Sequence, residues 1–215
     1  MSLNNIYTYW EGKEYAYIGM CYETLIKNRG ASMNVYRMSD YCGPYKFQSI
    51  NHKTDWMKAN LIYENGGFWI DADMIVTNDL SPLIALVEKH GFAGIPGFFG
   101  AKPGNKILGN WISNMRTLLE SGKELVHSAL IRPLLDDKNF DPFGVFTRDM
   151  ICPIYHTGDE FWKFFENLQP EEVLAQDNYI VTLYNSSFDK EFKRMDRQQL
   201  LDTSWLLSRI FKKYI

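Results

Sequence analysis

The chain has 215 residues, a length that suits one domain of ordinary to large size. Hydrophobic residues make up 46% of it and charged residues 23%, a globular composition that excludes a disordered chain. The net charge is -3 and no long block of Lys or Arg occurs, so nucleic acid is not expected as the main partner.

The first half of the chain alternates strands and helices. The expected strands are residues 5–10, 33–38 and 68–70, and the chain stays apolar at 74–76. The expected helices are 15–27, 54–64 and 82–89. A loop is expected at 39–45. Asp55 is expected in the first turn of its helix, where a carboxylate is favourable to the helix dipole. This alternation indicates an α/β fold with mostly parallel strands flanked by helices.

The second half of the chain is more irregular. The expected elements are a Gly-containing strand at 91–99, helices at 106–120 and 124–135, a strand at 145–150, a helix at 159–168, a strand at 179–184 and an amphipathic helix at 198–214. The last helix is more typical of packing on a core, and a peripheral membrane contact stays open as the alternative. Because no linker is visible, we expect a single domain over residues 1–215.

Three cysteines, Cys21, Cys42 and Cys152, are widely spaced and form no C-x-x-C pair. We expect them to be buried thiols in a reducing compartment. No apolar run approaches the ~20 residues of a membrane span, and the N-terminus lacks the form of a signal peptide. These features predict a cytoplasmic location.

The most informative stretch is Gly-Gly-Phe-Trp-Ile-Asp-Ala-Asp at 66–73. It predicts a short buried strand that begins after a glycine pair and ends in two carboxylates, Asp71 and Asp73. Two unpaired carboxylates at that position repel each other, and a divalent cation removes this cost. Mg²⁺ and Mn²⁺ bind through carboxylates and the phosphates of a substrate. The stretch therefore indicates a phosphorylated substrate held by Mn²⁺ or Mg²⁺, although a strand that ends in a polar turn is the simpler alternative.

Several segments resemble one family of enzymes. The opening Ile-Tyr-Thr-Tyr-Trp-Glu-Gly at 6–12 resembles the start of the capsular-polysaccharide-synthesis glycosyltransferases, which are similar to yeast-type mannosyltransferases and clostridial glucosylating toxins. The run from Asp55 to Asp73 resembles the family pattern S-D-x-x-R-x-x-x-L-Y-x-x-G-G-x-x-x-D-x-D. Residues 99–104 resemble the strand and turn that follow this pattern, and residues 179–188 resemble a C-terminal segment written H-x-x-x-S-W.

The resemblance implies a GT-A-type, Rossmann-like fold and a glycosyltransferase that uses a nucleotide-sugar donor, most often a UDP-sugar, and a saccharide or glycan acceptor. The residues that it assigns to donor binding are Thr8, Tyr9, Trp10, Asp55, Lys58, Asp71, Ala72, Asn185 and Ser187. It assigns Mn²⁺ or Mg²⁺ to Asp73 as the main ligand, with Asp71, and names these two residues as the catalytic pair.

Within this assignment, Trp10 would face the nucleobase, with Thr8 and Tyr9 beside it. Asp55 and Lys58 would contact the donor sugar or the ribose, and Asp71 would bind hydroxyls of both.

Asn185 and Ser187 would lie near the diphosphate. The chain departs from the family pattern at three positions: Lys58 replaces Arg, Thr182 replaces His and Phe188 replaces Trp. These changes put a bidentate sugar contact, a third metal ligand and an indole donor in question.

Simpler roles exist for most of these residues: Trp10 in the core, Asp55 as a helix cap, Lys58 as a solvated charge, and 185–187 as a polar turn. His156 is a candidate for the acceptor pocket. If the reaction inverts the anomeric configuration, it needs a carboxylate base. Asp79, Asp149 and Asp159 are candidates, and the sequence ranks none of them.

Three other functions compete. A phosphohydrolase of the haloacid-dehalogenase type would use Asp71 as its nucleophile, but a second Asp four residues after Asp159 is absent. A sugar nucleotidyltransferase would need a Gly-rich loop after the first strand, and residues 11–14 do not form one. A non-catalytic carbohydrate-binding domain is the third alternative.

Overall fold

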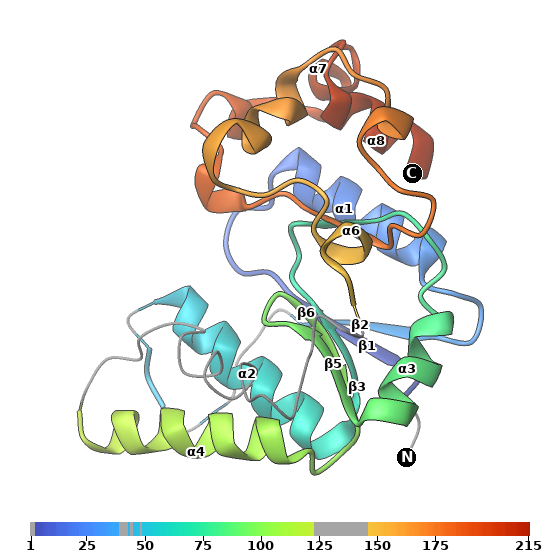
Figure 1. Cartoon of the computed structure of the whole chain (residues 1–215). Helices are drawn as coiled ribbons and strands as arrows, with labels where there is room; N and C mark the ends of the chain where they lie inside the picture. Colours follow the sequence, from blue (N-terminus) through green and yellow to red (C-terminus); the bar gives the residue numbers. More distant parts are fainter. Residues whose placement is uncertain (1–2, 39–42, 44, 48, 123–145) are drawn as a thin grey trace. The chain divides into compact units, whose positions relative to one another are not determined.

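The computed structural model describes residues 3–38, 43, 45–47, 49–122 and 146–215, which fall into two compact units (Figure 1). The large-sheet unit contains the described residues of Met1–Glu11, Ser32–Asp71 and Pro82–Phe146. The small-sheet unit contains those of Gly12–Ala31, Ala72–Ser81 and Thr147–Ile215. Both units are therefore assembled from separate segments of the chain, and a single domain over residues 1–215 stays a prediction.

The large-sheet unit is built on five strands. Its elements are β1 (Asn5–Tyr9), β2 (Asn34–Met38), α2 (Ile50–Asn65), β3 (Gly67–Ile70), α3 (Pro82–His90), β5 (Phe92–Ile95), β6 (Phe98–Ala101) and α4 (Lys106–Glu120). The strand order is β2-β1-β3-β6-β5. β1 pairs in parallel with β2 and β3, whereas β6 is antiparallel to both β3 and β5. Four of the five strands therefore run in one direction, which confirms the mostly parallel sheet, and the antiparallel β6 makes it a mixed one.

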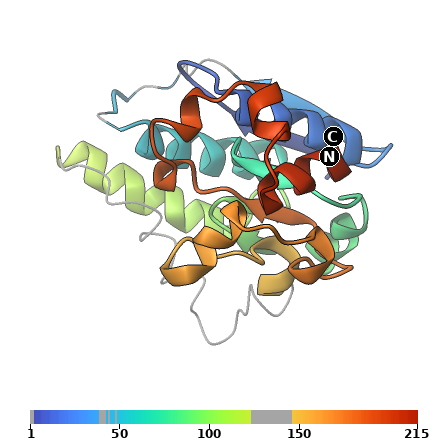
Figure 2. The same ribbon diagram turned by 90° about the horizontal axis from the view of Figure 1, so that it is seen from above.

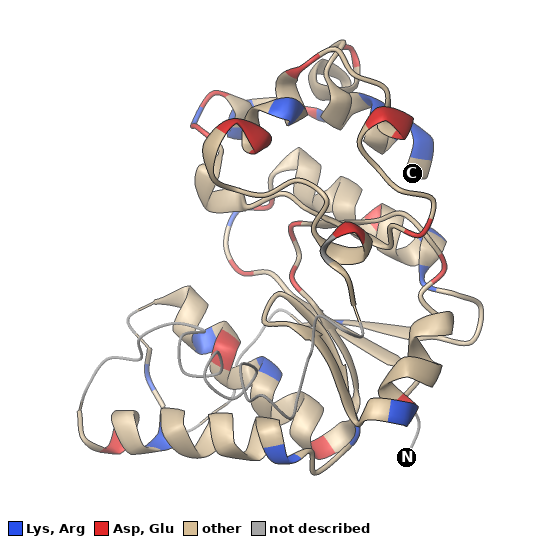
Figure 3. Cartoon of the chain, in the orientation of Figure 1, with Lys and Arg blue, Asp and Glu red and all other residues tan. Residues whose placement is uncertain are grey.

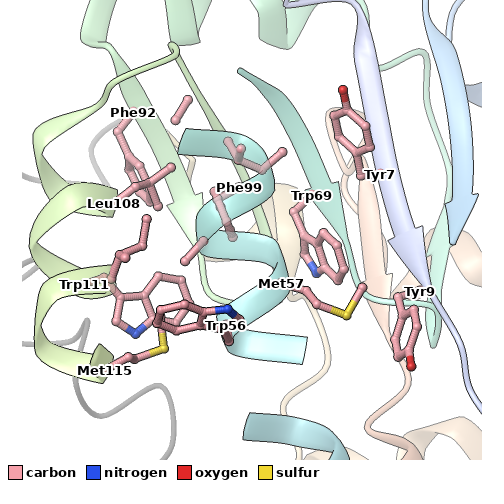
Figure 4. Close-up of a cluster of buried hydrophobic side chains, with 14 residues drawn as sticks. Tyr7, Tyr9, Trp56, Met57, Trp69, Phe92, Phe99, Leu108, Trp111 and Met115 are labelled. Atoms are coloured by element: carbon pink, nitrogen blue, oxygen red, sulfur yellow. The ribbon is translucent and has the colours of Figure 1, made fainter. Parts of the chain in front are cut away.

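Helices cover both faces of this sheet. α2 and α4 lie side by side in both views (Figures 1 and 2). They bury one face, where Trp69 and Phe99 pack with Trp111 of α4 (Figure 4). Phe68 points to the other face, where it lies near Val87 of α3. Because neighbouring side chains of a strand point to opposite faces, β3 reads as a continuous apolar run.

The glycine pair joins α2 to β3. Gly66 ends α2 with its N–H donating to the Ile62 carbonyl at 2.8 Å, and its φ is 69°. Gly67 has a φ of 100°, and a Cβ there would lie 2.4 Å from the carbonyl oxygen of Asn5. Only glycine fits these two backbone positions without strain. The pair therefore lets β3 pair closely with β1.

The small-sheet unit is built mainly from helices. Its elements are α1 (Ala16–Asn28), β4 (Met74–Val76), α6 (Arg148–Ile151), η2 (Gly158–Phe165), η3 (Pro170–Glu172), β7 (Ile180–Thr182), η4 (Asn185–Ser187), η5 (Phe192–Arg194), α7 (Arg197–Leu201) and α8 (Leu206–Tyr214), where η denotes a 3₁₀ helix. β4 and β7 form an antiparallel pair, and α1 packs on β4.

The apolar side of α8 is buried within this unit. Leu206, Leu207, Ile210 and Phe211 are all buried, and α8 packs on α1, α7 and η2. This arrangement agrees with packing on a core as the role of the amphipathic C-terminal segment. Among the described residues, no helix combines the length and the apolar character needed to cross a bilayer. Figure 3 shows basic and acidic segments interspersed over the described elements.

Most predicted elements of the first half are confirmed to within one or two residues, and the helix at 106–120 is confirmed as α4. Five predictions were wrong in detail. The strand at 91–99 is a hairpin, β5 and β6, because the chain turns at Pro96-Gly97. The described part of 145–150 contains helix α6, and 159–168 contains the 3₁₀ helix η2.

The segment 198–214 is also divided, into α7 and α8, since the chain leaves the helical conformation at 202–205. Asp55 lies in the second turn of α2, because the helix begins at Ile50 behind a Ser49 cap. Strand 179–184 is shorter than predicted and is confirmed as β7. The predicted helix at 124–135, most of the loop at 39–45, and Cys42 lie outside the described residues.

Candidate active site

Asp71 lies at the end of β3, in the large-sheet unit. Its backbone N–H donates to the Gly97 carbonyl at 2.9 Å, so the residue stays attached to the β6 side of the sheet. Trp69 is two residues earlier and lies on the same side of the strand. Its indole Nε1 donates to Asp71 Oδ1 at 2.6 Å. The fixed backbone and the indole together hold the Asp71 carboxylate in one orientation.

Helix α2 brings a buried ion pair to the same carboxylate. Lys58 Nζ lies 2.7 Å from Asp55 Oδ1 and 3.8 Å from Asp71 Oδ1. The Lys58 and Asp55 side chains are only 5% and 9% exposed, whereas Asp71 is 32% exposed. Lys58 Nζ also lies over the Trp111 ring, 6.0 Å from its centre. The solvated helix charge considered for Lys58 is therefore wrong, and the accessible end of this triad is Asp71.

The end of β1 carries the three residues assigned to the nucleoside. Thr8 is buried, and its Oγ1 has no hydrogen-bond partner in the part of the chain that the structure describes. The Tyr9 hydroxyl donates to Glu11, which also accepts from Lys53. Burial raises the pKa of Tyr9, and the hydrogen bond to Glu11 adds to this rise. Trp10 follows the strand and is half-buried.

Asp73 lies just before β4, in the small-sheet unit. The pairing of Met74 with Thr182 places the chain after β7 alongside it. The Leu183 N–H donates to the Asp73 carbonyl at 2.9 Å, and the Asn185 N–H donates to Asp73 Oδ2 at 2.8 Å. The structure therefore brings together two residues that are 112 positions apart and that the sequence assigned to the metal and the diphosphate.

Asn185 is held from its other side by helix α1. The hydroxyl of Tyr17, a residue that is 1% exposed, donates to Asn185 Oδ1. Burial raises the pKa of the Tyr17 hydroxyl, and the negative charge of Asp73 raises it further. Burial likewise raises the pKa of the Cys21 thiol, again with a contribution from Asp73. The negative charge of Asp73 thus contributes to the raised pKa values of two side chains of α1, Tyr17 and Cys21.

The remaining predicted residues of this unit differ in exposure. Ala72 is half-exposed and Ser187 is exposed. Thr182, at the position where the resembled sequence pattern has His, is buried, and its Oγ1 has no hydrogen-bond partner among the described residues. Phe188 stacks on Phe192 with 4.1 Å between ring centres. Phe188 therefore occupies an aromatic core position.

The acceptor and base candidates lie on the surface. His156 is exposed and packs on the ring of Tyr184, 4.9 Å away between centres. Asp149 and Asp159 are exposed. Asp79 is also exposed, and its Oδ1 accepts from the backbone and hydroxyl of Ser81. No described contact of these carboxylates distinguishes one of them as a base.

A divalent cation would find few protein ligands here. No group of three or more His, Cys, Asp or Glu residues is placed to hold a metal ion among the described residues. Mg²⁺ and Mn²⁺ are often bound by one or two carboxylates together with substrate phosphates. The half-exposed Asp73 carboxylate fits that mode, in which the substrate supplies most of the ligands.

Sequence reasoning missed three residues that support these side chains. Trp69 could have been found, because it precedes Asp71 by two positions in a strand. Tyr17 and Tyr184 gave no local signal. Tyr184 has a φ of 54°, which is the single positive value outside glycine in the described chain, and it directly precedes Asn185.

Comparison with known proteins supports the fold. No family model and no curated protein matches the chain. The apo form of the glycosyltransferase GlyE from Streptococcus pneumoniae TIGR4 is similar in structure, with a TM-score of 0.58 and 13% identity over 98% of this chain. A second structure of GlyE gives a TM-score of 0.56 and 15% identity over 98%. In both cases the chain spans 59% of the length of GlyE.

The protein therefore has an α/β fold of the GT-A type. Its structural neighbours are glycosyltransferases, and the predicted fold class is confirmed.

Proposed function

We propose that this protein is a metal-dependent glycosyltransferase that moves a sugar from a nucleotide-sugar donor, with UDP as the first nucleotide to test, to a saccharide or glycan acceptor. The observation that carries the proposal is the different environment of the two carboxylates of the Asp-x-Asp sequence. Asp71 lies beside an ammonium and an indole N–H, whereas Asp73 accepts from the backbone N–H of Asn185. Two carboxylates with different partners suit two different tasks.

Asp73 is the better metal ligand of the two. Its carboxylate is half-exposed and accepts a hydrogen bond from a neutral backbone N–H. The Lys58 ammonium, 3.8 Å from Asp71, opposes a cation at Asp71. When bound, Mn²⁺ or Mg²⁺ would neutralise charge that develops on the leaving diphosphate.

Asp71 is suited to accept hydrogen bonds from hydroxyl groups of the donor. Its partly exposed carboxylate is oriented by the Trp69 indole, and the Lys58 ammonium lies 3.8 Å from it. Asp55 is more deeply buried, so its role is to hold Lys58 in place rather than to contact sugar. Trp10 is proposed to stack on the nucleobase, as a half-buried aromatic residue in the loop after a strand can.

The test is a thermal-unfolding panel of UDP-, GDP- and ADP-sugars with and without Mn²⁺. A donor at a hundredfold excess over its Kd adds about 2.7 kcal/mol of stability, or roughly 5–10 °C for a chain of this size. We expect one donor to stabilise the wild type in a Mn²⁺-dependent way. Asp73→Ala should still unfold in one cooperative transition without ligand, at a temperature lowered by loss of the hydrogen bond from the Asn185 N–H. Measured against that temperature, it should lose the Mn²⁺-dependent part of the shift.

Asp177→Ala is the matched control, because it removes an exposed carboxylate of the same unit. It should keep the full shift. An Asp73→Ala variant that retains the Mn²⁺-dependent shift contradicts the proposal. Release of phosphate from sugar phosphates, lost in Asp71→Asn, would support the phosphohydrolase alternative instead.

A further inference from the structure

Three contacts converge on Asn185 in the small-sheet unit. Its backbone N–H donates to Asp73 Oδ2 at 2.8 Å, and its side-chain Oδ1 accepts from the Tyr17 hydroxyl. The preceding residue, Tyr184, adopts the left-handed conformation with φ 54° and ψ 64°. A bulky residue is rare in that region and costs about 1–3 kcal/mol there. Both ends of Asn185 are therefore fixed by its surroundings.

We infer that Tyr17 is a positioning residue for donor binding: its hydroxyl fixes the Asn185 amide so that Nδ2 donates to a phosphate oxygen of the nucleoside diphosphate held beside Asp73. This inference rests on the proposed function. It deepens that function by assigning a role to a residue of α1 that neither the motif nor the family resemblance singles out.

The chemistry of the amide sets the direction of donation. An asparagine side chain has one acceptor oxygen and one donor NH₂ group, both bonded to the planar amide carbon and pointing in different directions. Because the Tyr17 hydroxyl donates to Oδ1, the NH₂ group is turned away from Tyr17. No hydrogen bond from Nδ2 occurs within the described residues. A phosphate oxygen is an acceptor that this donor can satisfy.

The Tyr17 ring is fixed well enough to act as a support. It packs against Phe192 at 5.2 Å and against the edge of Phe188 at 5.5 Å between ring centres. It also stacks on Tyr15 at 5.7 Å. Because aromatic neighbours pack against the ring, they restrict the position of its hydroxyl. The amide that the hydroxyl contacts then loses less entropy when substrate binds.

Tyr184 is held in its unfavourable conformation by contacts of its own. Its hydroxyl lies 2.6 Å from the sulfur of Cys152, and its ring lies 4.9 Å from that of His156. These contacts help to maintain the turn that directs the Asn185 N–H to Asp73. The backbone N–H of Asn185 thus donates to Asp73, and the side-chain NH₂ group of Asn185 remains available to donate to the diphosphate.

The experiment is a double-mutant cycle on full-length chains. Binding of UDP, GDP and ADP, each with Mn²⁺, is measured by calorimetry for wild type, Tyr17→Phe, Asn185→Ala and the double variant. Loss of one hydrogen bond weakens binding by about fivefold, so we expect that loss in Tyr17→Phe. Because Tyr17 acts through Asn185, the double variant should bind as weakly as Asn185→Ala and no more weakly.

Two further readouts separate positioning from a general structural effect. Binding of Mn²⁺ alone, followed by electron paramagnetic resonance, should be unchanged in Tyr17→Phe, because the Asn185 N–H still reaches Asp73. Tyr179→Phe removes another tyrosine hydroxyl of the same unit, one without a side-chain hydrogen bond among the described residues, and should bind as the wild type does.

A folded Tyr17→Phe variant that binds the diphosphates as tightly as the wild type overturns the inference, and so do losses that multiply in the double variant. If Tyr17→Phe does not fold, Asn185→Asp replaces it, because Asp still accepts from Tyr17 but cannot donate. Wild-type affinity in Asn185→Asp would overturn the inference equally. If no diphosphate binds the wild type, the proposed function itself fails.

Discussion

Replacing Lys58 with methionine tests the buried ion pair of α2. The Met side chain fills a similar volume but leaves the Asp55 carboxylate, which is 9% exposed, without the ammonium that lies 2.7 Å away. Removing one partner of a buried pair typically costs about 3–5 kcal/mol, because the other charge stays buried. Since Asp71 is 32% exposed and 3.8 Å away, water can replace its share of the interaction. We therefore expect a loss near the lower figure, about 3 kcal/mol.

For a chain of this length, about 3 kcal/mol corresponds to a fall in Tm of roughly 6–12 °C. Urea unfolding followed by tryptophan fluorescence measures the same loss as a change in the free energy of unfolding. In Asp55→Asn/Lys58→Met the buried charge is removed with its partner. That double variant should recover most of the lost stability, because a neutral amide is far less costly to bury than a carboxylate.

Lys53→Met is the matched control on the same helix. Lys53 pairs with Glu11, whose side chain is 44% exposed, and such surface pairs contribute at most about 1 kcal/mol. If Lys58→Met costs no more stability than Lys53→Met, or if the double variant is less stable than Lys58→Met, then Asp55 and Lys58 do not form the buried pair described above.

Two further predictions concern the small-sheet unit. Asn178 is 1% exposed and donates from Nδ2 to the Asp149 carbonyl at 2.8 Å, while its Oδ1 accepts from Thr77. Asn178→Ala removes the side-chain donor and acceptor from this buried position, although the Thr77 hydroxyl still donates to the backbone carbonyl of residue 178. Urea unfolding should therefore show a loss of about 1–3 kcal/mol, and wild-type stability would refute this. Burial raises the pKa of Cys21 above its ordinary value of 9.0, so above that pH the unfolded state binds fewer protons and stability falls. Relative to Cys21→Ala, the wild type should lose about 1.4 kcal/mol per pH unit above that value, and a difference that does not change with pH would contradict it.

Local patterns were sufficient for the elements that place the acidic pair. The apolar run before Asp71 and the glycine pair predicted β3, because both signals are contained within a few residues. Helix α4 was predicted with its observed bounds, and Asn105 caps it by accepting from the Ile107 N–H. The hairpin of β5 and β6 was missed although Pro96-Gly97 is a common turn signal. The apolar residues on both sides of the turn were interpreted as one continuous strand.

The supporting contacts could not be predicted in this way. A lysine three positions after an aspartate in a helix is compatible with a solvated ion pair. The burial of Lys58 beside Trp111 of α4 depends on tertiary packing, which the local sequence does not contain. Tyr17 and Asn185 are 168 positions apart and meet only because α1 and the segment after β7 belong to one unit. The conformation of Tyr184 is unfavourable for its residue type, so sequence preference predicts the opposite.

The two carboxylates of the Asp-x-Asp sequence contact different sets of residues. Because of this difference, mutations can test their proposed roles separately. Lys58 and Trp69 act on Asp71, in the large-sheet unit, whereas Asn185 acts on Asp73, in the small-sheet unit. A change confined to the first set should therefore alter the choice of donor sugar without changing affinity for Mn²⁺ and a free nucleoside diphosphate. A change in the second set should weaken the diphosphate equally for every sugar attached to it, because the phosphates are common to all the donors.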